Sequence, residues 1–258
     1  MQPILELKNI SLSYHSMQSA LPALSDINFA VYPGEFAAIV GPSGCGKSTL
    51  LNLITGLLPL EEGQILYNQK PMTPQNRPII GYMLQKDHLF EWRSIYKNIL
   101  LGLEIQHKKT PENLAHIDSL LKQYGLDAFK TARPSQLSGG MRQRAALIRT
   151  LAMHPELLLL DEPFSALDYQ TRLNVSDDIG RIIRKEKKTA ILVTHDISEA
   201  VSMADRIVVL SKRPATVQTI VPIDLGIEPA LRTPMQSRNT AEFKNYFNRI
   251  WKELNQNG

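Results

Sequence analysis

The sequence predicts an α/β fold in which a mostly parallel sheet is joined to an antiparallel β layer and to a helical segment. Three observations predict it. From Leu157 onward, apolar strand-like runs alternate with helix-like segments, which is the pattern of a parallel sheet. Residues 3–40 alternate short apolar runs with turns, as antiparallel strands do. Between residues 94 and 153, apolar residues recur at helical spacing.

The N-terminal part is expected to form the antiparallel layer. Its apolar runs are Ile4–Leu7 and Ile27–Val31, and a turn at Pro33–Glu35 leads into the buried strand Phe36–Val40. After Gly63, we expect strands at Gln64–Tyr67 and Ile79–Leu84 around a turn-rich segment.

The middle of the chain is expected to be a helical subdomain over about residues 90–155. Pro111 is a favoured first residue of a helix, and Tyr124–Gly125 is a typical helix end. Beyond it, the alternation predicts strands at Leu157–Leu160, Thr189–Val193 and Arg206–Leu210, with helices near 169–187 and 197–204 between them.

The last part, about residues 211–258, reads as an extension of the same domain. A strand is expected at Thr216–Val221, followed by an amphipathic helix, and docking of that helix on its own domain is favoured over a partner-binding role. We therefore expect one domain over residues 1–258 with no separate regulatory domain. The apolar stripe of the helix consists of Phe243, Phe247, Ile250, Trp251 and Leu254.

Composition excludes several classes of protein. No window has the roughly 18 uninterrupted apolar residues of a membrane span, and the N-terminus does not resemble a signal peptide, so a cytoplasmic location is expected. Cys45 is the only cysteine, which excludes a disulfide within one chain and a cysteine-based metal cluster, and we interpret it as a small loop filler.

The net charge of +4 is too small to indicate nucleic-acid binding. The charge is unevenly distributed, because residues 211–258 carry seven basic and four acidic side chains. A basic extension can favour an anionic membrane surface, but a solvated face is the preferred interpretation.

Residues 41–49 fit the pattern G-x-x-x-x-G-K-[ST], a loop that wraps nucleotide phosphates in backbone N–H groups. Glycines allow the close turn, Lys47 reaches the β- and γ-phosphates, and the Ser48 hydroxyl is a ligand for Mg²⁺. A buried strand enters the loop and a helix leaves it, so the context agrees with the pattern. The residues predicted to bind the nucleotide are Gly41, Ser43, Gly44, Cys45, Gly46, Lys47, Ser48 and Thr49.

A second group of polar residues follows the leucine strand at 157–160. Asp161 and Glu162 stand at its carboxyl end, where a parallel sheet opens to its ligand. We expect Asp161 to belong to the coordination shell of Mg²⁺, and Glu162 to orient or deprotonate the water that attacks the γ-phosphate.

A third motif, Leu137–Met141, precedes a helix. The hydroxyl of Ser138 and the amides of Gly139 and Gly140 are expected to form another anion-binding helix N-terminus. One chain would then carry two phosphate-binding ends.

In this order, the three motifs closely resemble those of the nucleotide-binding ATPase subunits of ABC transporters, and the resemblance covers residues 4 to about 210. It implies ATP and Mg²⁺ as cofactors and a head-to-tail dimer, in which Ser138 serves the ATP of a second copy. Met141 departs from the family, which usually has glutamine there; we expect altered packing at the dimer interface and retained hydrolysis.

The resemblance implies further site residues. Gln85 resembles the glutamine that touches Mg²⁺ and water, and His195 resembles the histidine that contacts the γ-phosphate. Asp168 lies in a loop similar to the one that links the two sites, and Tyr14 resembles the aromatic residue that stacks on adenine. Tyr14 can also be an ordinary strand-end tyrosine.

The resemblance also implies a role in import. Without membrane spans, the chain would need a separate permease and would lie on the cytoplasmic face of the inner membrane. Lys86–Ile95 occupies the position that receives the permease, and with Ser211–Ala215 it resembles the nitrate, sulfonate and taurine importers, although importers of pyrimidine vitamin precursors share both features. An extracytoplasmic binding protein would then select the solute. The alternative is a soluble ABC ATPase without a permease, such as an iron–sulfur assembly ATPase.

Overall fold

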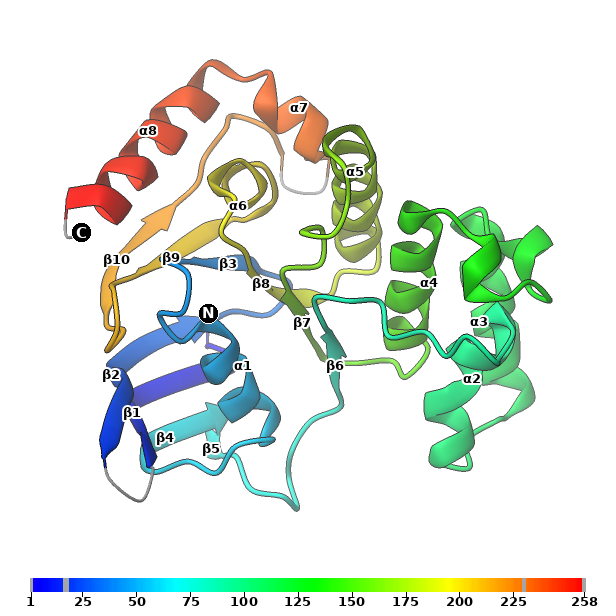
Figure 1. Ribbon diagram of the computed structural model, residues 1–258, viewed down its shortest axis with the longest axis horizontal. Coiled ribbons are helices and arrows are strands. Elements are labelled where there is room, and N and C mark those ends of the chain that lie inside the picture. The colour runs from blue at the N-terminus through cyan, green and yellow to red at the C-terminus, as the bar shows by residue number, and fades with distance from the viewer. Residues whose placement is uncertain (1, 16–18, 229–230, 257–258) are drawn as a thin grey trace.

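The computed structural model describes residues 2–15, 19–228 and 231–256 as two sheets with a helical region at one side (Figure 1). Within these residues the larger sheet has the strand order β10-β9-β3-β8-β7-β6. Neighbours from β9 to β6 pair in parallel, and β10 pairs antiparallel with β9. The strands are β3 (Phe36–Val40), β6 (Ile80–Met83), β7 (Leu157–Asp161), β8 (Thr189–Val193), β9 (Arg206–Leu210) and β10 (Val217–Pro222).

The parallel sheet separates two hydrophobic cores. Along β3, Ala38 and Val40 pack into one core and Ala37 and Ile39 into the other, because successive side chains of a strand point to opposite faces. The first core lies under helices α4 to α6 and α8, and the second lies between the sheet, α1 and the antiparallel layer. Both faces of the central strands are thus covered, which explains their uninterrupted apolar runs.

The antiparallel layer has the order β2-β1-β4-β5 and confirms the prediction for the N-terminal part. Its first two strands are longer than the predicted runs, because irregularities in their pairing let the ladder continue past Asn9 (φ +52°) and Asp26 (φ +49°). The short strand β5 was not predicted. The strands are β1 (Leu5–His15), β2 (Ala20–Val31), β4 (Glu62–Tyr67) and β5 (Lys70–Pro71).

Most helices begin at a side-chain cap. Ser94, Thr110, Ser138 and Asp168 each accept a hydrogen bond from the backbone N–H three residues later. The α-helices are α1 (Lys47–Thr55), α2 (Ile95–Ile105), α3 (Pro111–Gln123), α4 (Gly139–Leu151), α5 (Tyr169–Lys185), α6 (Ile197–Met203), α7 (Pro234–Arg238) and α8 (Ala241–Gln256), with 3-10 turns at Asp127–Phe129 and Pro134–Gln136.

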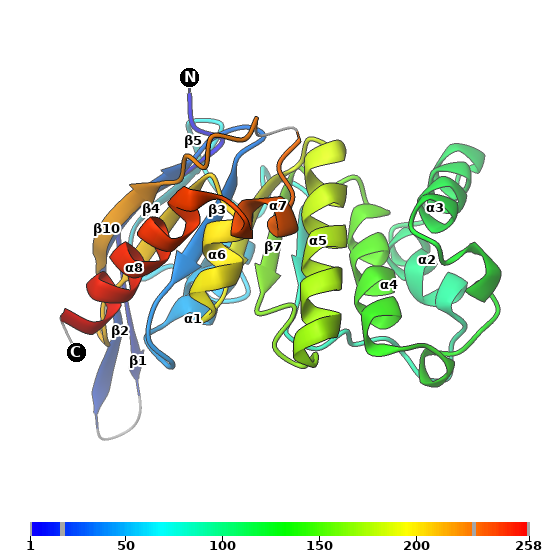
Figure 2. The same ribbon diagram turned by 90° about the horizontal axis from the view of Figure 1, so that it is seen from above.

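Helices α2 and α3 lie beyond α4, away from the parallel sheet (Figures 1 and 2). At the other end of the molecule, α8 docks on its own domain as predicted. Ile250 is fully buried, and Phe243, Phe247 and Leu254 pack against the same core. Trp251 differs from the rest of the predicted stripe, since it is 56% exposed.

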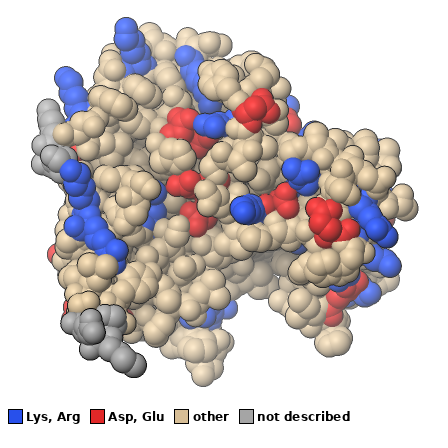
Figure 3. Space-filling model, viewed as in Figure 1, with Lys and Arg blue, Asp and Glu red and all other residues tan. Residues whose placement is uncertain are grey.

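Lys and Arg side chains gather along the left edge of the face seen in Figure 3, where α8 and β10 lie in Figure 1. No helix in the described part of the chain combines the length and the apolar character needed to cross a membrane.

Candidate functional site

The loop between β3 and α1 requires glycine at two positions. Gly44 has φ +74° and Gly46 has φ +122°, which are conformations that side chains disfavour. A Cβ on Gly46 would lie 2.8 Å from Leu24 Cδ2. Cys45 between them is buried, as a loop filler would be, and burial raises the pKa of its thiol. The loop therefore turns tightly at the start of α1, where helix amides attract anions.

Lys47 is held inside this loop. Its side chain is 6% exposed, and Nζ donates hydrogen bonds to the carbonyl oxygens of Gly41 (2.8 Å) and Pro42 (2.9 Å). The ammonium group is thereby fixed beside the glycine turn, where a phosphate can meet it without reorganisation of the loop.

Asp161 ends β7 next to the loop and is 8% exposed. The Ser48 hydroxyl donates to Oδ1 of Asp161 at 3.2 Å, and the Tyr82 hydroxyl donates to Oδ2 at 3.3 Å. Burial raises the pKa of Asp161, while these two hydrogen bonds oppose the shift. A buried carboxylate beside a serine hydroxyl is an oxygen donor set of the kind that Mg²⁺ prefers.

Glu162 follows in a left-handed backbone conformation, with φ +45°. Its N–H donates to the carbonyl of Val193 at 2.8 Å, which ties this turn to the neighbouring strand. The carboxylate Oε2 lies 3.1 Å from Nδ1 of His195 and 3.5 Å from Nε2 of Gln85. The fold thus brings together the predicted base, histidine and glutamine from three separate segments.

Most of the predicted site residues share one cavity of about 340 Å³. It has a polar wall from the glycine loop and an acidic wall from the end of β7. His195 borders an adjoining cavity together with Gly41 and Ser43. The residues that line the shared cavity are Ser43, Gly44, Gly46, Lys47, Ser48, Thr49, Gln85, Asp161 and Glu162.

Tyr14 lies near the end of β1 and is bound to the phosphate-loop helix. Its hydroxyl and Oγ1 of Thr49 are 2.8 Å apart. The guanidinium of Arg213 lies over the Tyr14 ring at 5.7 Å, held by a hydrogen bond from Nε to the Pro22 carbonyl. Tyr14 is 43% exposed, and Thr49 and Arg213 hold its side chain in position.

The residues of the third motif do not line the shared cavity. Ser138 caps α4, and a Cβ on Gly140 would lie 2.8 Å from Val175 Cγ2, so glycine permits close packing of α4 on α5. A Cβ on Gly139 would likewise lie 3.0 Å from Leu167 Cδ2, so this glycine also packs closely. Asp168 caps α5, and its hydrogen bonds with Thr171 lower its pKa. In Figure 2, the N-terminal ends of α4 and α5 face the same side as the carboxyl ends of β3 and β7.

The comparisons with known proteins identify this arrangement. The protein-family model described as "ABC transporter" matches residues 24–165. The chain belongs to the ABC transporter family. It is 46% identical over 251 residues, 97% of this chain and 95% of the relative, to the uncharacterised ABC transporter ATP-binding protein YtlC of Bacillus subtilis. The aliphatic sulfonates import ATP-binding protein SsuB of Bacillus licheniformis is 41% identical over 214 residues, 82% of each chain.

Solved ABC cassettes share the fold. The ATP-binding cassette MJ0796, in a dimeric post-hydrolysis state bound to ADP and Pi, is 30% identical with a TM-score of 0.72, and the match covers 85% of this chain and 99% of that chain. The cassette cbiO1 of Clostridium perfringens, part of the complex cbiONQ, has a TM-score of 0.73 at 26% identity, covering 92% of this chain and 90% of that chain. The present chain is therefore an ABC-type ATPase with the expected α/β cassette fold.

Sequence reasoning missed three residues in or beside the cassette site. Tyr82 stands on β6, and its hydroxyl lies 3.3 Å from both Asp161 Oδ2 and Asn52 Oδ1. Arg213 is one of the basic residues of the extension, and no local pattern predicts its contact with the Tyr14 ring. Glu199 was not noticed, although a glutamate in the first turn of the helix after His195 is a signal that could have been read.

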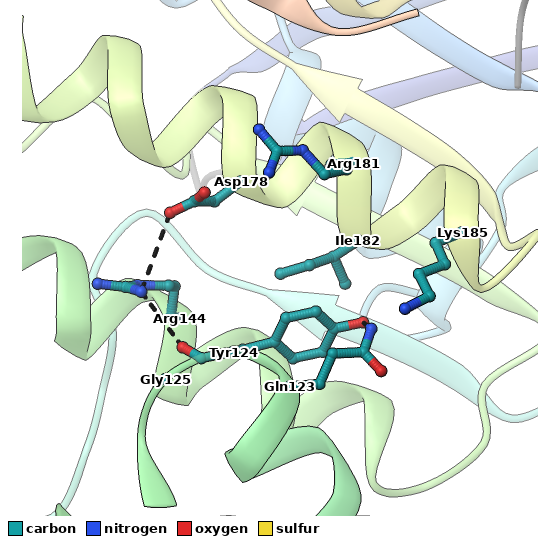
Figure 4. Close-up of a pocket in the computed structure, with 8 residues that line it drawn as sticks. All are labelled: Gln123, Tyr124, Gly125, Arg144, Asp178, Arg181, Ile182 and Lys185. Carbon is teal, nitrogen blue, oxygen red and sulfur yellow. Dashed lines mark hydrogen bonds and ion pairs between the residues drawn. The ribbon is translucent and has the colours of Figure 1, made fainter. Parts of the chain in front are cut away.

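A further cavity of about 370 Å³ lies outside the nucleotide site, between the end of α3 and helices α4 and α5 (Figure 4). Arg144 crosses it, donating from Nη1 to the carbonyl of Tyr124 at 3.2 Å and lying 4.0 Å from Oδ2 of Asp178. These contacts connect the helical region to α5.

The buried carboxyl of Glu199 is expected to make the stability of the cassette depend on pH. It is 3% exposed, accepts a hydrogen bond from Thr194 Oγ1 at 2.6 Å, and burial raises its pKa from 4.5 to about 7. Between these values the native state holds a proton that the unfolded chain releases, so stability falls as pH rises through that window, by about 3 kcal/mol.

We therefore expect Glu199→Gln to be more stable than the wild type at pH 8, with a difference that narrows below pH 5. Urea unfolding of both proteins at a series of pH values measures this. Glu62→Gln at an exposed position of β4 is the control. Parallel stability curves for the wild type and Glu199→Gln would contradict the assignment.

Proposed function

We propose that this ABC ATPase powers a membrane importer of a small solute, working as a dimer bound to a permease at the cytoplasmic face of the cell membrane. The observation that carries the proposal is the 41% identity, over 82% of both chains, to a protein named for aliphatic sulfonate import. The solute would be nitrate-, sulfonate- or taurine-like, or a pyrimidine vitamin precursor. An extracytoplasmic binding protein would deliver it to the permease.

In this proposal, Gly41–Thr49 binds the phosphates of ATP and Lys47 meets the β- and γ-phosphates. Ser48, Gln85 and Asp161 hold Mg²⁺, and the contact between the Ser48 hydroxyl and the Asp161 carboxylate supports this because both supply oxygen donors. When bound, the ion neutralises charge that develops on the phosphates.

Glu162 would orient and deprotonate the attacking water, while His195 and Gln85 position that water and the γ-phosphate. Their contacts with the same Glu162 oxygen support these roles. Tyr14 would stack on adenine. Ser138, Gly139, Gly140 and Asp168 would complete the site of a second copy, which accounts for their position outside the cavity of their own chain.

The turn after Gln85 offers a surface for the permease. Trp92 is 73% exposed and its ring centre lies 4.7 Å from that of Phe90. Buried Asn98 fixes the turn, since its side chain accepts from the Phe90 N–H and donates to the carbonyls of Phe90 and Arg93. A rigid turn that presents an exposed aromatic residue suits a protein partner.

The test is to purify the Glu162→Gln protein from native membranes in ATP and Mg²⁺ and to identify its companions by mass spectrometry. We expect a permease, and repeating the capture with Trp92→Ser should lose it. Recovery in the soluble fraction without any membrane protein would reject the importer and favour a permease-free ABC ATPase. Uptake assays with the associated binding protein would then identify the solute.

A further inference from the structure

The C-terminal end of α8 reaches the nucleotide side of the molecule. Trp251, Leu254 and Asn255 line a cavity of about 360 Å³ whose other walls include Pro42, Ser43, His195 and Lys212. Ser43 also lines the phosphate cavity, so the two cavities meet at this residue. In Figure 2, this end of α8 lies on the side that also holds the N-terminal ends of α4 and α5.

Helix α8 is held against its own domain near this cavity. Ile250 is fully buried in the core, and the Tyr246 hydroxyl accepts a hydrogen bond from the Asp224 N–H at 3.2 Å. The Phe247 ring, packed against the core, lies parallel to the indole of Trp251, at 6.4 Å between ring centres and 10° between planes. The indole is therefore held in position without being buried.

Docking of α8 leaves 56% of Trp251 exposed. A large apolar ring fixed in solvent beside a functional site is typical of a protein contact, and tryptophan is enriched among the residues that carry binding energy. Trp251 lines the same cavity as Ser43 and His195. A protein that covers the phosphate cavity would therefore also approach Trp251.

On the proposed function, the protein that covers this cavity is a second copy of the chain. Ser138, Gly139 and Asp168 do not line the phosphate cavity of their own chain, although α4 and α5 present their N-terminal ends on the same side. On the proposed function, these residues complete the site of the neighbouring copy, so the two copies face each other across the surface that Trp251 borders.

We propose that Trp251, Leu254, Asn255 and Lys212 form part of the contact between two copies in the ATP-bound dimer. This inference rests on the proposed function. Because α8 lies beyond residue 210, where the motif resemblance ends, the contact would be an addition to the cassette. Closure of the dimer would bury the indole, and ATP at Ser43 would thereby be linked to the C-terminal helix.

The first experiment uses the two tryptophans of the chain, Trp92 and Trp251. In the double variant Trp92→Phe, Glu162→Gln, all tryptophan fluorescence comes from Trp251, and Glu162→Gln is intended to retain ATP. We expect ATP and Mg²⁺ to shift the emission to shorter wavelength and to reduce quenching by acrylamide at protein concentrations that give dimers. The double variant Trp251→Phe, Glu162→Gln reports Trp92 instead and should remain open to acrylamide.

The second experiment measures the dimer dissociation constant by sedimentation in ATP and Mg²⁺. In the Glu162→Gln background, Trp251→Ser should raise this constant by roughly tenfold. The matched control is Ile105→Ser, because Ile105 is 69% exposed at the end of α2 and is not part of either cavity.

The outcomes separate the inference from the proposed function. A dimer that leaves Trp251 open to acrylamide, with an unchanged dissociation constant for Trp251→Ser, overturns the inference and leaves the function intact. Absence of any ATP-dependent dimer in the Glu162→Gln protein overturns the dimeric mechanism and the inference with it.

Discussion

Glu162→Gln is expected to lower the turnover number for ATP at least about 100-fold while the protein still binds ATP and Mg²⁺. The amide has the shape of the carboxylate but cannot take a proton from water. Glu162 stands in a strained turn, φ +45°, that places Oε2 within 3.1 Å of His195 Nδ1, so the effect should be local to the reacting group. Phosphate release gives the rate, and equilibrium binding of a fluorescent ATP analogue gives the affinity.

The control for this experiment is Glu62→Gln, which makes the same chemical change on β4, outside the cavity. It should keep wild-type turnover. If Glu162→Gln also hydrolyses ATP at the wild-type rate, Glu162 is not the base. If it loses ATP affinity together with turnover, the carboxylate supports binding of the nucleotide instead of the chemical step.

The phosphate loop and the acidic end of β7 were predictable because their signals are local. The glycine spacing of residues 41–46 needs left-handed or unusual backbone at Gly44 and Gly46, and the structure has it. Asp161 and Glu162 follow an apolar run, and parallel strands bring their carboxyl ends to one edge. Gln85 and His195, whose roles the family resemblance implies, also follow strands, and the fold brings both close to Glu162.

The missed features depend on contacts between distant parts of the chain. Arg213 lies over Tyr14 although about 200 residues separate them, and neither position has a local pattern that predicts the pair. The buried carboxyl of Glu199 looks like an ordinary helical glutamate until the packing of Thr194 against it is known. Similarly, the stripe of α8 predicted docking, but only the fold shows that Trp251 is left exposed beside the phosphate loop.

Ser138→Arg and Lys47→Ala are each expected to abolish ATP hydrolysis, and mixing the two proteins should restore part of it. If each site uses Lys47 of one copy and Ser138 of the other, a mixed dimer keeps one intact site. With random assortment half of the dimers are mixed, so independent sites would recover up to about a quarter of the wild-type rate. Phosphate release from equimolar mixtures, compared with each variant alone, measures the recovery.

The cap of α4 must be separated from this role. Ser138 accepts a hydrogen bond from the Met141 N–H at 3.3 Å, and Ser94 accepts one of the same length from the Lys97 N–H at the start of α2. Loss of either cap costs about 1 kcal/mol, so Ser94→Ala is the control for a weakened helix start and should retain hydrolysis. Wild-type turnover by Ser138→Arg alone would show that Ser138 serves no nucleotide. If both variants are folded and inactive and stay inactive when mixed, two independent sites shared between copies are contradicted. Each mixed dimer would contain one intact site, and that site would then be unable to work without the other.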